Sequence, residues 1–454
     1  MADPAHWTES QVANVSQWQE LRSLVEPFHV EGSSSLPPFC GGAAGLLSYD
    51  WCRAIEDIPE AELELFPTPR IAMGIYDLVV AWDHQESVCW LISNGFPETD
   101  LQQRAALASQ QLSSTYQQLR TILAAQSTSK NLAVNCGGFE EVSNFDLPDV
   151  YRRVDDADRT WPFPIWAAST KGEHEEALQR SIAYLRAGDV FQVNIAQQLL
   201  VAIEDSALDY FWRLREQNPA PMMAYFDLGR QQVVSASPER LFSVAGLQVE
   251  TRPIKGTCRR TGDAKVDSQA AERLLASTKN GAENVMIVDL LRNDLSKVCR
   301  DDSVNVSALC ELEPYQFVQH LTSVVVGDLR PGLSAWDVMP AIFPGGSISG
   351  APKVRALEII NELEPVARGP YCGSIGYIGF PSQDGAAADW NILIRTATVQ
   401  NGWCQIPVGG GIVLDSEPTA EYQETLTKAY GMLAAVRAPQ DCPTLPSVSG
   451  EKAK

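Results

Sequence analysis

Lys255 is a residue around which chemistry could be built, because it lies between a proline and a glycine in the segment RPIKGT. A lysine held beside a metal cation has a lowered pKa, and its neutral amine is a nucleophile. Glu239, upstream in the segment SPER, is a candidate proton donor. The alternative is a charged surface lysine, the commonest role of this residue type.

Carboxylates cluster on the last predicted helix, at residues 418–436. One stripe of this helix carries Glu417, Glu421, Glu424 and Lys428. The stripe is either a solvated face with ion pairs or a set of repelling carboxylates that share a cation, and oxygen ligands suit Mg²⁺. Glu283 is expected in the first turn of a helix at 283–298, where the helix dipole favours an anion.

Several other residues could bind an anion. Arg395 lies in an apolar run, 391–399, and there it needs a buried carboxylate or an anionic substrate. The glycines at 409–411 follow a predicted strand and either expose N–H groups to a ligand or form a tight turn. Ser347, in GGSISGAPK, precedes a helix N-terminus, although the phosphate-loop spacing fails. His320 and Thr322 alternate along a predicted strand. The default interpretation of His320 is a core histidine.

Helices and strands alternate clearly in the part of the chain that must position these residues. Thr170 and Glu173 form a capping box, and Gly188 is placed to end the helix that follows. Helices are predicted at 101–125, 267–278, 283–298, 353–363 and 418–436, and strands at 70–82, 190–197, 231–236, 315–327, 373–380, 390–399 and 405–408. This pattern predicts an α+β fold, a large sandwich of two subdomains with extensive, mostly antiparallel β-sheets flanked by helices.

The chain divides by composition into four segments. These are an N-terminal region at 1–130, a polar connection at 131–165, a C-terminal part at 166–436 that carries the candidate site residues, and a tail at 437–454. Within the first segment, residues 1–25 are polar and expected to be loosely ordered.

Charge and composition limit the classes of function. The formal net charge of −22 disfavours binding to nucleic acids and to anionic membranes. The start of the chain shows neither a basic region nor an apolar region of a signal peptide. The ten cysteines form no CxxC pair, so we expect reduced thiols and a cytoplasmic protein.

A series of motifs makes the chain similar to the chorismate-using enzymes, a family that includes anthranilate and isochorismate synthases. The motifs are SPERL, RPIKGT, AENVMIVDLLRNDL, GGSISGAPK, CGSIGYIGF, IRTATV, GGGIVLDSEP and AEYQETLTKA. The resemblance covers residues 165–435, and more weakly 37–50, and it implies the same fold.

The resemblance also implies roles for individual residues, named here by their positions in this chain. Glu283 and Glu424, with Glu421 nearby, would hold Mg²⁺ and through it the ring carboxylate of chorismate. The enolpyruvyl carboxylate would be bound by Arg395 and Tyr377. The remaining substrate contacts would come from Gly409, Gly411, Lys428, Ser347, Thr257 and Gln192. His320 would border the ring as a catalytic residue.

Two positions distinguish members of the family. Gln192 stands where the water-adding members resemble one another in carrying a lysine base, and a glutamine cannot take a proton from water. PIKGT resembles the aminodeoxychorismate synthases, whereas anthranilate synthases typically carry alanine in place of Lys255. The implied reaction passes through a covalent Lys255 adduct, with Glu239 as acid, towards 4-aminobenzoate and folate.

The ammonia for this reaction would come from a separate glutamine amidotransferase subunit, because no glutaminase motif is recognisable in the chain. Two alternatives stay open at this point. One is anthranilate synthase component I, and the other is a partner subunit that binds chorismate without turnover.

Overall fold

The computed structural model describes residues 4–11, 15–31, 35–128, 150–154, 161–315, 318–383 and 385–439. Most of the predicted connection at 131–165 and nearly all of the predicted tail lie outside these ranges. None of the described helices combines the length and the apolar character that crossing a membrane requires.

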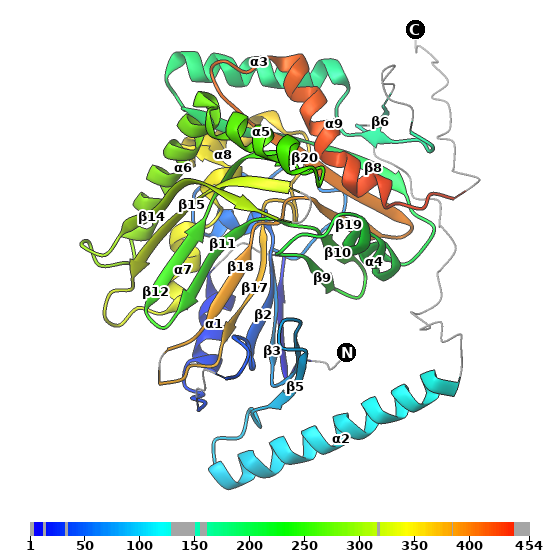
Figure 1. The fold of residues 1–454 in the computed structure, drawn as a ribbon, viewed down its shortest axis with the longest axis vertical. Coiled ribbons are helices and arrows are strands. Elements are labelled where there is room, and N and C mark those ends of the chain that lie inside the picture. Colours follow the sequence, from blue (N-terminus) through cyan, green and yellow to red (C-terminus); the bar gives the residue numbers. More distant parts are fainter. Residues whose placement is uncertain are drawn as a thin grey trace.

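Two large sheets form the frame of the molecule (Figure 1). The ten-stranded sheet has the order β1 (His6–Ser10), β3 (Ile71–Tyr76), β2 (Gly42–Leu47), β17 (Ser374–Gly379), β18 (Ala388–Asn391), β11 (Arg240–Ala245), β12 (Gln248–Arg252), β15 (Val318–Asp328) and β13 (Ile254–Arg259), with β14 (Asn305–Pro314) paired to β15. The eight-stranded sheet has the order β6 (Arg152–Arg153), β7 (Trp166–Ala167), β8 (Gln192–Ala202), β20 (Trp403–Ile412), β19 (Thr396–Gln400), β10 (Gln232–Ser235) and β9 (Ala224–Asp227), with β16 (Gly350–Ala351) paired to β8. A separate hairpin joins β4 (Leu78–Asp83) to β5 (Val88–Ser93).

All strand pairs of the two large sheets are antiparallel in the described part of the chain, which confirms the predicted α+β class. The sheets do not follow the order of the sequence. β2 pairs with β17, so strands from the two ends of the chain are neighbours in one sheet. β18 and β19 are consecutive in the chain but belong to different sheets.

Helices cover the sheets and connect their strands. They are α1 (Ser16–Val25), α2 (Leu101–Thr128), α3 (Lys171–Ala187), α4 (Ala207–Gln217), α5 (Ala264–Leu275), α6 (Thr278–Ser296), α7 (Ala335–Ile342), α8 (Lys353–Leu363) and α9 (Pro418–Ala434), with 3-10 turns η1 (Tyr49–Ala54) and η2 (Gly346–Ile348). α9 packs on β20 and on α3, whereas α6 packs on β13 and β15. α2 contacts β5 and extends away from the rest of the molecule (Figure 1).

Local sequence explains where the main helices begin and end. The predicted capping box of α3 is present, since Thr170 accepts from the Glu173 N–H, and Gly188 ends the helix at φ 83°. Ser277 caps α6 through the N–H of Asn280. Glu417 caps α9, and Pro418 occupies its first turn.

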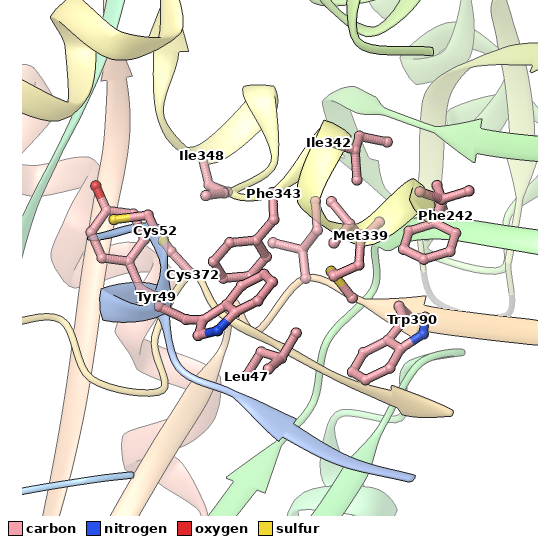
Figure 2. Packing of buried hydrophobic residues seen from close by; sticks show 14 of the residues in the cluster. Leu47, Tyr49, Cys52, Phe242, Met339, Ile342, Phe343, Ile348, Cys372 and Trp390 are labelled. Atoms are coloured by element: carbon pink, nitrogen blue, oxygen red, sulfur yellow. The ribbon is translucent and has the colours of Figure 1, made fainter. Parts of the chain in front are cut away.

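The largest core cluster joins the N-terminal strands to both sheets. Figure 2 shows Met339 and Phe343, at the end of α7, in this cluster with Leu47 and Trp390. Burial of each such large apolar side chain contributes roughly 1.5–3 kcal/mol. This packing fixes the two sheets relative to each other, and the cleft described below lies between them.

Two local predictions in the N-terminal region are wrong. Residues 1–25 are not loosely ordered throughout, because β1 pairs with β3 and α1 buries Trp18 completely. The single strand predicted at 70–82 is two strands, β3 and β4, because the chain leaves the ten-stranded sheet at Asp77.

Candidate active site

A single cleft is lined by residues from both sheets and encloses about 1690 Å³, counting its open mouth. β13 and β15 contribute from the ten-stranded sheet, and β8 and β20 from the eight-stranded sheet. α6, α9 and η2 complete the lining. The predicted site residues found here are Lys255, Glu239, His320, Thr257, Arg395, Gly409, Gly411, Lys428, Ser347, Glu283, Glu421 and Glu424.

Lys255 and Glu239 line the same cleft. Their pKa shifts suit nucleophilic attack by Lys255 and proton transfer by Glu239. Glu239 is 5% exposed, and burial raises its pKa. Lys255 is half-buried in the cleft lining, and burial lowers its pKa. Their mutual attraction opposes both shifts without reversing them. Each pKa is therefore shifted in the direction that favours the uncharged form of its group.

His320 lies on β15 opposite Thr257 of β13, and its Nδ1 is 2.8 Å from the Thr257 hydroxyl. Burial, reinforced by the charge of Arg395, lowers the pKa of His320 to about 4. The ring is neutral near pH 7, so it can border a ligand and exchange a hydrogen bond with it.

Arg395 is not inside a continuous strand, which corrects the strand predicted at 390–399. β18 ends at Asn391, β19 begins at Thr396, and Arg395 has φ 49°. The break arises because the chain crosses here from one sheet to the other. Burial lowers the pKa of Arg395, and no ion pair to it is found among the described residues. Of the two explanations left open, a buried salt bridge and an anionic ligand, the cleft favours the ligand.

Acidic and basic side chains of α6 and α9 line the same cleft. Glu283 of α6 lies 3.9 Å from Lys279 Nζ, and Glu424 of α9 lies 2.8 Å from Lys428 Nζ. Glu421 accepts a hydrogen bond of 2.7 Å from Ser416, and burial raises its pKa. α6 begins at Thr278, so Glu283 is beyond the first turn, and the prediction of an N-terminal dipole position is wrong.

These carboxylates suit Mg²⁺ in their chemistry. No three acidic, histidine or cysteine side chains of the described ranges surround one point as metal ligands would. Mg²⁺ usually takes one or two protein carboxylates and keeps water or substrate oxygens in its other positions. Glu283 and Glu424, one from each helix, line the cleft and would supply such a pair, whereas Glu421 is buried and accepts a hydrogen bond from Ser416.

The three glycines at 409–411 lie inside β20, so neither the predicted strand end at Val408 nor the alternative of a tight turn is correct. Gly409 pairs with Ala196 and accepts a hydrogen bond of 3.0 Å from Lys428 Nζ. A side chain at Gly409 would place its Cβ 2.7 Å from the carbonyl oxygen of Ile195. The Ser347 hydroxyl of η2 lies beside the Glu239 carboxyl group and favours its ionised form.

Two predicted substrate contacts are not part of this lining. Tyr377 lies in β17 between β2 and β18, and its ring packs 4.6 Å from that of Phe39. Gln192 is fully buried behind Gly411, whose Cβ position would be 2.9 Å from the glutamine Nε2.

The lining also contains residues that were not predicted from the sequence, among them Tyr371, Asn194 and Lys279. Tyr371 belongs to the same glycine-rich segment as Tyr377, and burial raises its pKa well above the usual value. Asn194 was visible only as one member of an alternating strand, yet its buried Oδ1 has no partner among the described residues. Lys279 carried a signal, because it precedes Glu283 by one helical turn.

A family model described as "chorismate binding enzyme" matches residues 2–434 of this chain. The chain belongs to the chorismate binding enzyme family. Among members of known name, aminodeoxychorismate synthase component 1 of Bacillus subtilis (strain 168) is 36% identical over 423 residues, which cover 93% of this chain and 82% of the relative. Anthranilate synthase component 1 of Thermus thermophilus is 35% identical over 419 residues, covering 92% of this chain and 82% of the relative.

The fold of this chorismate binding enzyme agrees with a solved structure. The crystal structure of anthranilate synthase component I from Streptococcus pneumoniae TIGR4 aligns with a TM-score of 0.76 and 30% identity, covering 95% of this chain and 91% of that one. The predicted family fold is therefore confirmed.

Proposed function

We propose that this chain is an aminodeoxychorismate synthase component 1, which converts chorismate and ammonia to 4-amino-4-deoxychorismate and water. The observation that carries the proposal is the pairing of Lys255 and Glu239 in one cleft, each with its pKa shifted towards the neutral form. Similarity to relatives of that name supports it.

The proposed reaction has two covalent steps. The neutral amine of Lys255 attacks C2 of the ring, both double bonds of the ring diene shift, and the C4 hydroxyl leaves as water with a proton from Glu239. Ammonia then bonds to C4, both double bonds shift back, and the amine of Lys255 leaves from C2. The proton lost by the attacking ammonia returns to Glu239, which restores both groups.

The other cleft residues would bind and orient the substrate. Arg395, supported by Tyr371, provides the charge and hydrogen bonds for the enolpyruvyl carboxylate, while Thr257 and His320 border the ring. Mg²⁺ held by Glu283 and Glu424 would supply positive charge for the ring carboxylate. Lys428 keeps Glu424 ionised, because the ammonium attracts that carboxylate against the effect of burial.

Ammonia would reach the cleft from a separate glutamine amidotransferase subunit. The relatives' names, which end in "component 1", support a second component. The product would then need a lyase to become 4-aminobenzoate, the precursor that folate synthesis uses.

Mass spectrometry of the trapped intermediate tests the proposal directly. The protein is incubated with chorismate and Mg²⁺ in the absence of ammonia, quenched and digested. An adduct is expected on the peptide that contains Lys255. The Lys255→Ala variant should lack the adduct. The Lys265→Ala variant should retain it, because Lys265 is an exposed residue on α5. Unchanged ammonia-dependent activity of Lys255→Ala would remove this lysine from the mechanism.

Anthranilate synthase is the second candidate, because relatives of that name match the chain almost as well. The two reactions differ in their released product. Fluorescent anthranilate formed without any added lyase would support the second candidate, whereas a product that needs a lyase to yield 4-aminobenzoate supports the first.

A further inference from the structure

Lys279 is a basic residue of the cleft for which the proposed reaction has no use. It lies on α6, and its Nζ is 3.9 Å from Glu283 Oε1. Its charge also reaches α9, where it favours the ionised forms of Glu421 and Glu424. Lys279 is therefore electrostatically part of the same carboxylate site as Glu283 and Glu424.

The lysines of the cleft differ in how firmly they are held. Lys428 makes a contact of 2.8 Å to Glu424 and donates to the carbonyl of Gly409 at 3.0 Å. Lys255 is half-buried on β13. Lys279 has one long contact, and its side chain is 57% exposed. An ion pair at this distance with an exposed lysine is held weakly, so the lysine side chain can leave at little cost.

We propose that Lys279 is a displaceable counter-ion, whose ammonium balances the carboxylates of α6 and α9 until a divalent cation binds and drives it towards solvent. This rests on the proposed function in one respect, the assignment of the divalent cation to Glu283 and Glu424. An ammonium and a divalent cation repel each other strongly at such short range, so the two compete for one group of carboxylates.

The competition has a consequence for the order of binding. While Lys279 balances the carboxylates, the apparent affinity for the metal is reduced, because the metal must first displace a favourable charge. A substrate carboxylate brings an additional negative charge into the cleft, which offsets the repulsion. Lys279 thereby makes metal binding without substrate weak and couples the two ligands.

Mn²⁺ binding to the full-length protein, followed by electron paramagnetic resonance without substrate, tests the inference. Lys279→Ala is expected to bind Mn²⁺ more tightly by roughly tenfold, and Lys279→Arg to stay near the wild type because it keeps the charge. Lys265→Ala, which removes a lysine outside the cleft lining, should leave the affinity unchanged. Raising the salt concentration should reduce the difference between Lys279→Ala and the wild type.

Several results would overturn the inference. Equal or weaker Mn²⁺ binding by Lys279→Ala would show that the ammonium does not compete with the metal. A large loss of chorismate affinity with unchanged Mn²⁺ affinity would make Lys279 a substrate ligand instead. Absence of Mn²⁺ binding in both proteins would remove the metal site itself. The reaction is judged separately, by the identity of the product, so a failure of the proposed activity is distinguishable from each of these results.

Discussion

At the scale of single residues, burial and neighbouring charges shift the pKa values of the cleft residues in different directions. Lys255 and Glu239 are shifted towards neutrality by burial, whereas Glu424 remains ionised. Burial acts to raise the pKa of Glu424, but the nearby Lys428 ammonium outweighs it, and the net shift is downward. An ionised carboxylate at this position is what a divalent cation requires.

Replacing Glu424 with glutamine should therefore weaken metal binding. We expect the Mg²⁺ concentration at half-maximal activity to rise by roughly tenfold or more, because a ligand charge is lost. Glu417→Gln is the matched control on the same helix, since Glu417 caps α9 and does not line the cleft. The assignment fails if both variants give the wild-type Mg²⁺ titration.

Site residues could be predicted from the sequence where a reactive type of side chain lies in a distinctive motif. Lys255 and Glu239 could be singled out because each is a reactive type in an unusual setting, and the structure brings both to one cleft. Tyr371 and Tyr377 could not be told apart, since both lie in one glycine-rich segment. Tyr371 precedes β17 and lines the cleft, whereas Tyr377 is inside the strand, and that difference is tertiary.

At the scale of elements, β20 shows why small residues are needed at the cleft wall. A Cβ at Gly409 would lie 2.7 Å from a backbone oxygen that cannot move aside, whereas a Cβ at Gly410 would meet only side-chain atoms, at 3.4 Å or more. Gly409→Ala is expected to lower the free energy of unfolding by about 1–3 kcal/mol, and Gly410→Ala by less than ~1 kcal/mol. Urea denaturation measures both, and equal losses would contradict the close approach of β8 and β20.

α3 carries a buried histidine that should make stability depend on pH. His174 is 2% exposed, and burial lowers its pKa to about 4. The unfolded chain has the ordinary value, so between these values it binds more protons than the folded protein, and stability is lost as the pH falls from about 6.5 to 4. The loss from this residue at pH 5 is about 2 kcal/mol.

Urea denaturation at pH 7 and pH 5 checks this expectation. His174→Phe should lose less stability between the two pH values than the wild type, whatever its stability at pH 7. His84→Phe, at an exposed turn position, should retain the wild-type difference. An unchanged difference in His174→Phe would mean that the buried ring does not control the acid sensitivity.

Element boundaries could be predicted where capping chemistry is local, as in α3 with Thr170 and Gly188. They could not be predicted where tertiary structure overrides the pattern. The apolar run at 391–399 satisfies a strand pattern, yet it is divided at Arg395 because its two halves pair with different sheets. Likewise, 409–411 continue β20 because β8 supplies a partner strand along its whole length.

At the scale of the whole molecule, Arg368 connects parts of the chain that are distant in sequence. Its guanidinium pairs with Glu364, donates to the carbonyls of Ile348 and Asn194, and lies over the Tyr49 ring at 4.7 Å. Its side chain is 1% exposed. The N-terminal part, η2 and β8 thus share one buried cation close to the cleft.

Arg368→Met should lower the free energy of unfolding by about 3–5 kcal/mol, because it leaves the Glu364 charge buried and unpaired. Replacing both partners with apolar residues should recover part of that loss. Arg355→Met, which breaks half-exposed ion pairs with Glu358 and Asp189, should cost less than ~1 kcal/mol. Equal losses at positions 368 and 355 in chemical denaturation would contradict a special role for the buried pair.

The α+β class could be predicted from the alternation of helices and strands, but the order of strands could not. Pairing between β2 and β17 leaves no trace in the local pattern of either strand. Only the folded chain shows that both belong to the middle of one sheet.

The adjacency of β2 and β17 also determines when the protein can acquire its native form during synthesis. Leu47 must remain without its partner Ser374 until several hundred further residues have left the ribosome. At roughly 5–20 residues per second, that delay is on the order of 20–60 s. Throughout this interval the nascent β2–β3 ribbon has one open hydrogen-bonding edge, so its protection by chaperones will influence how much active enzyme a cell obtains.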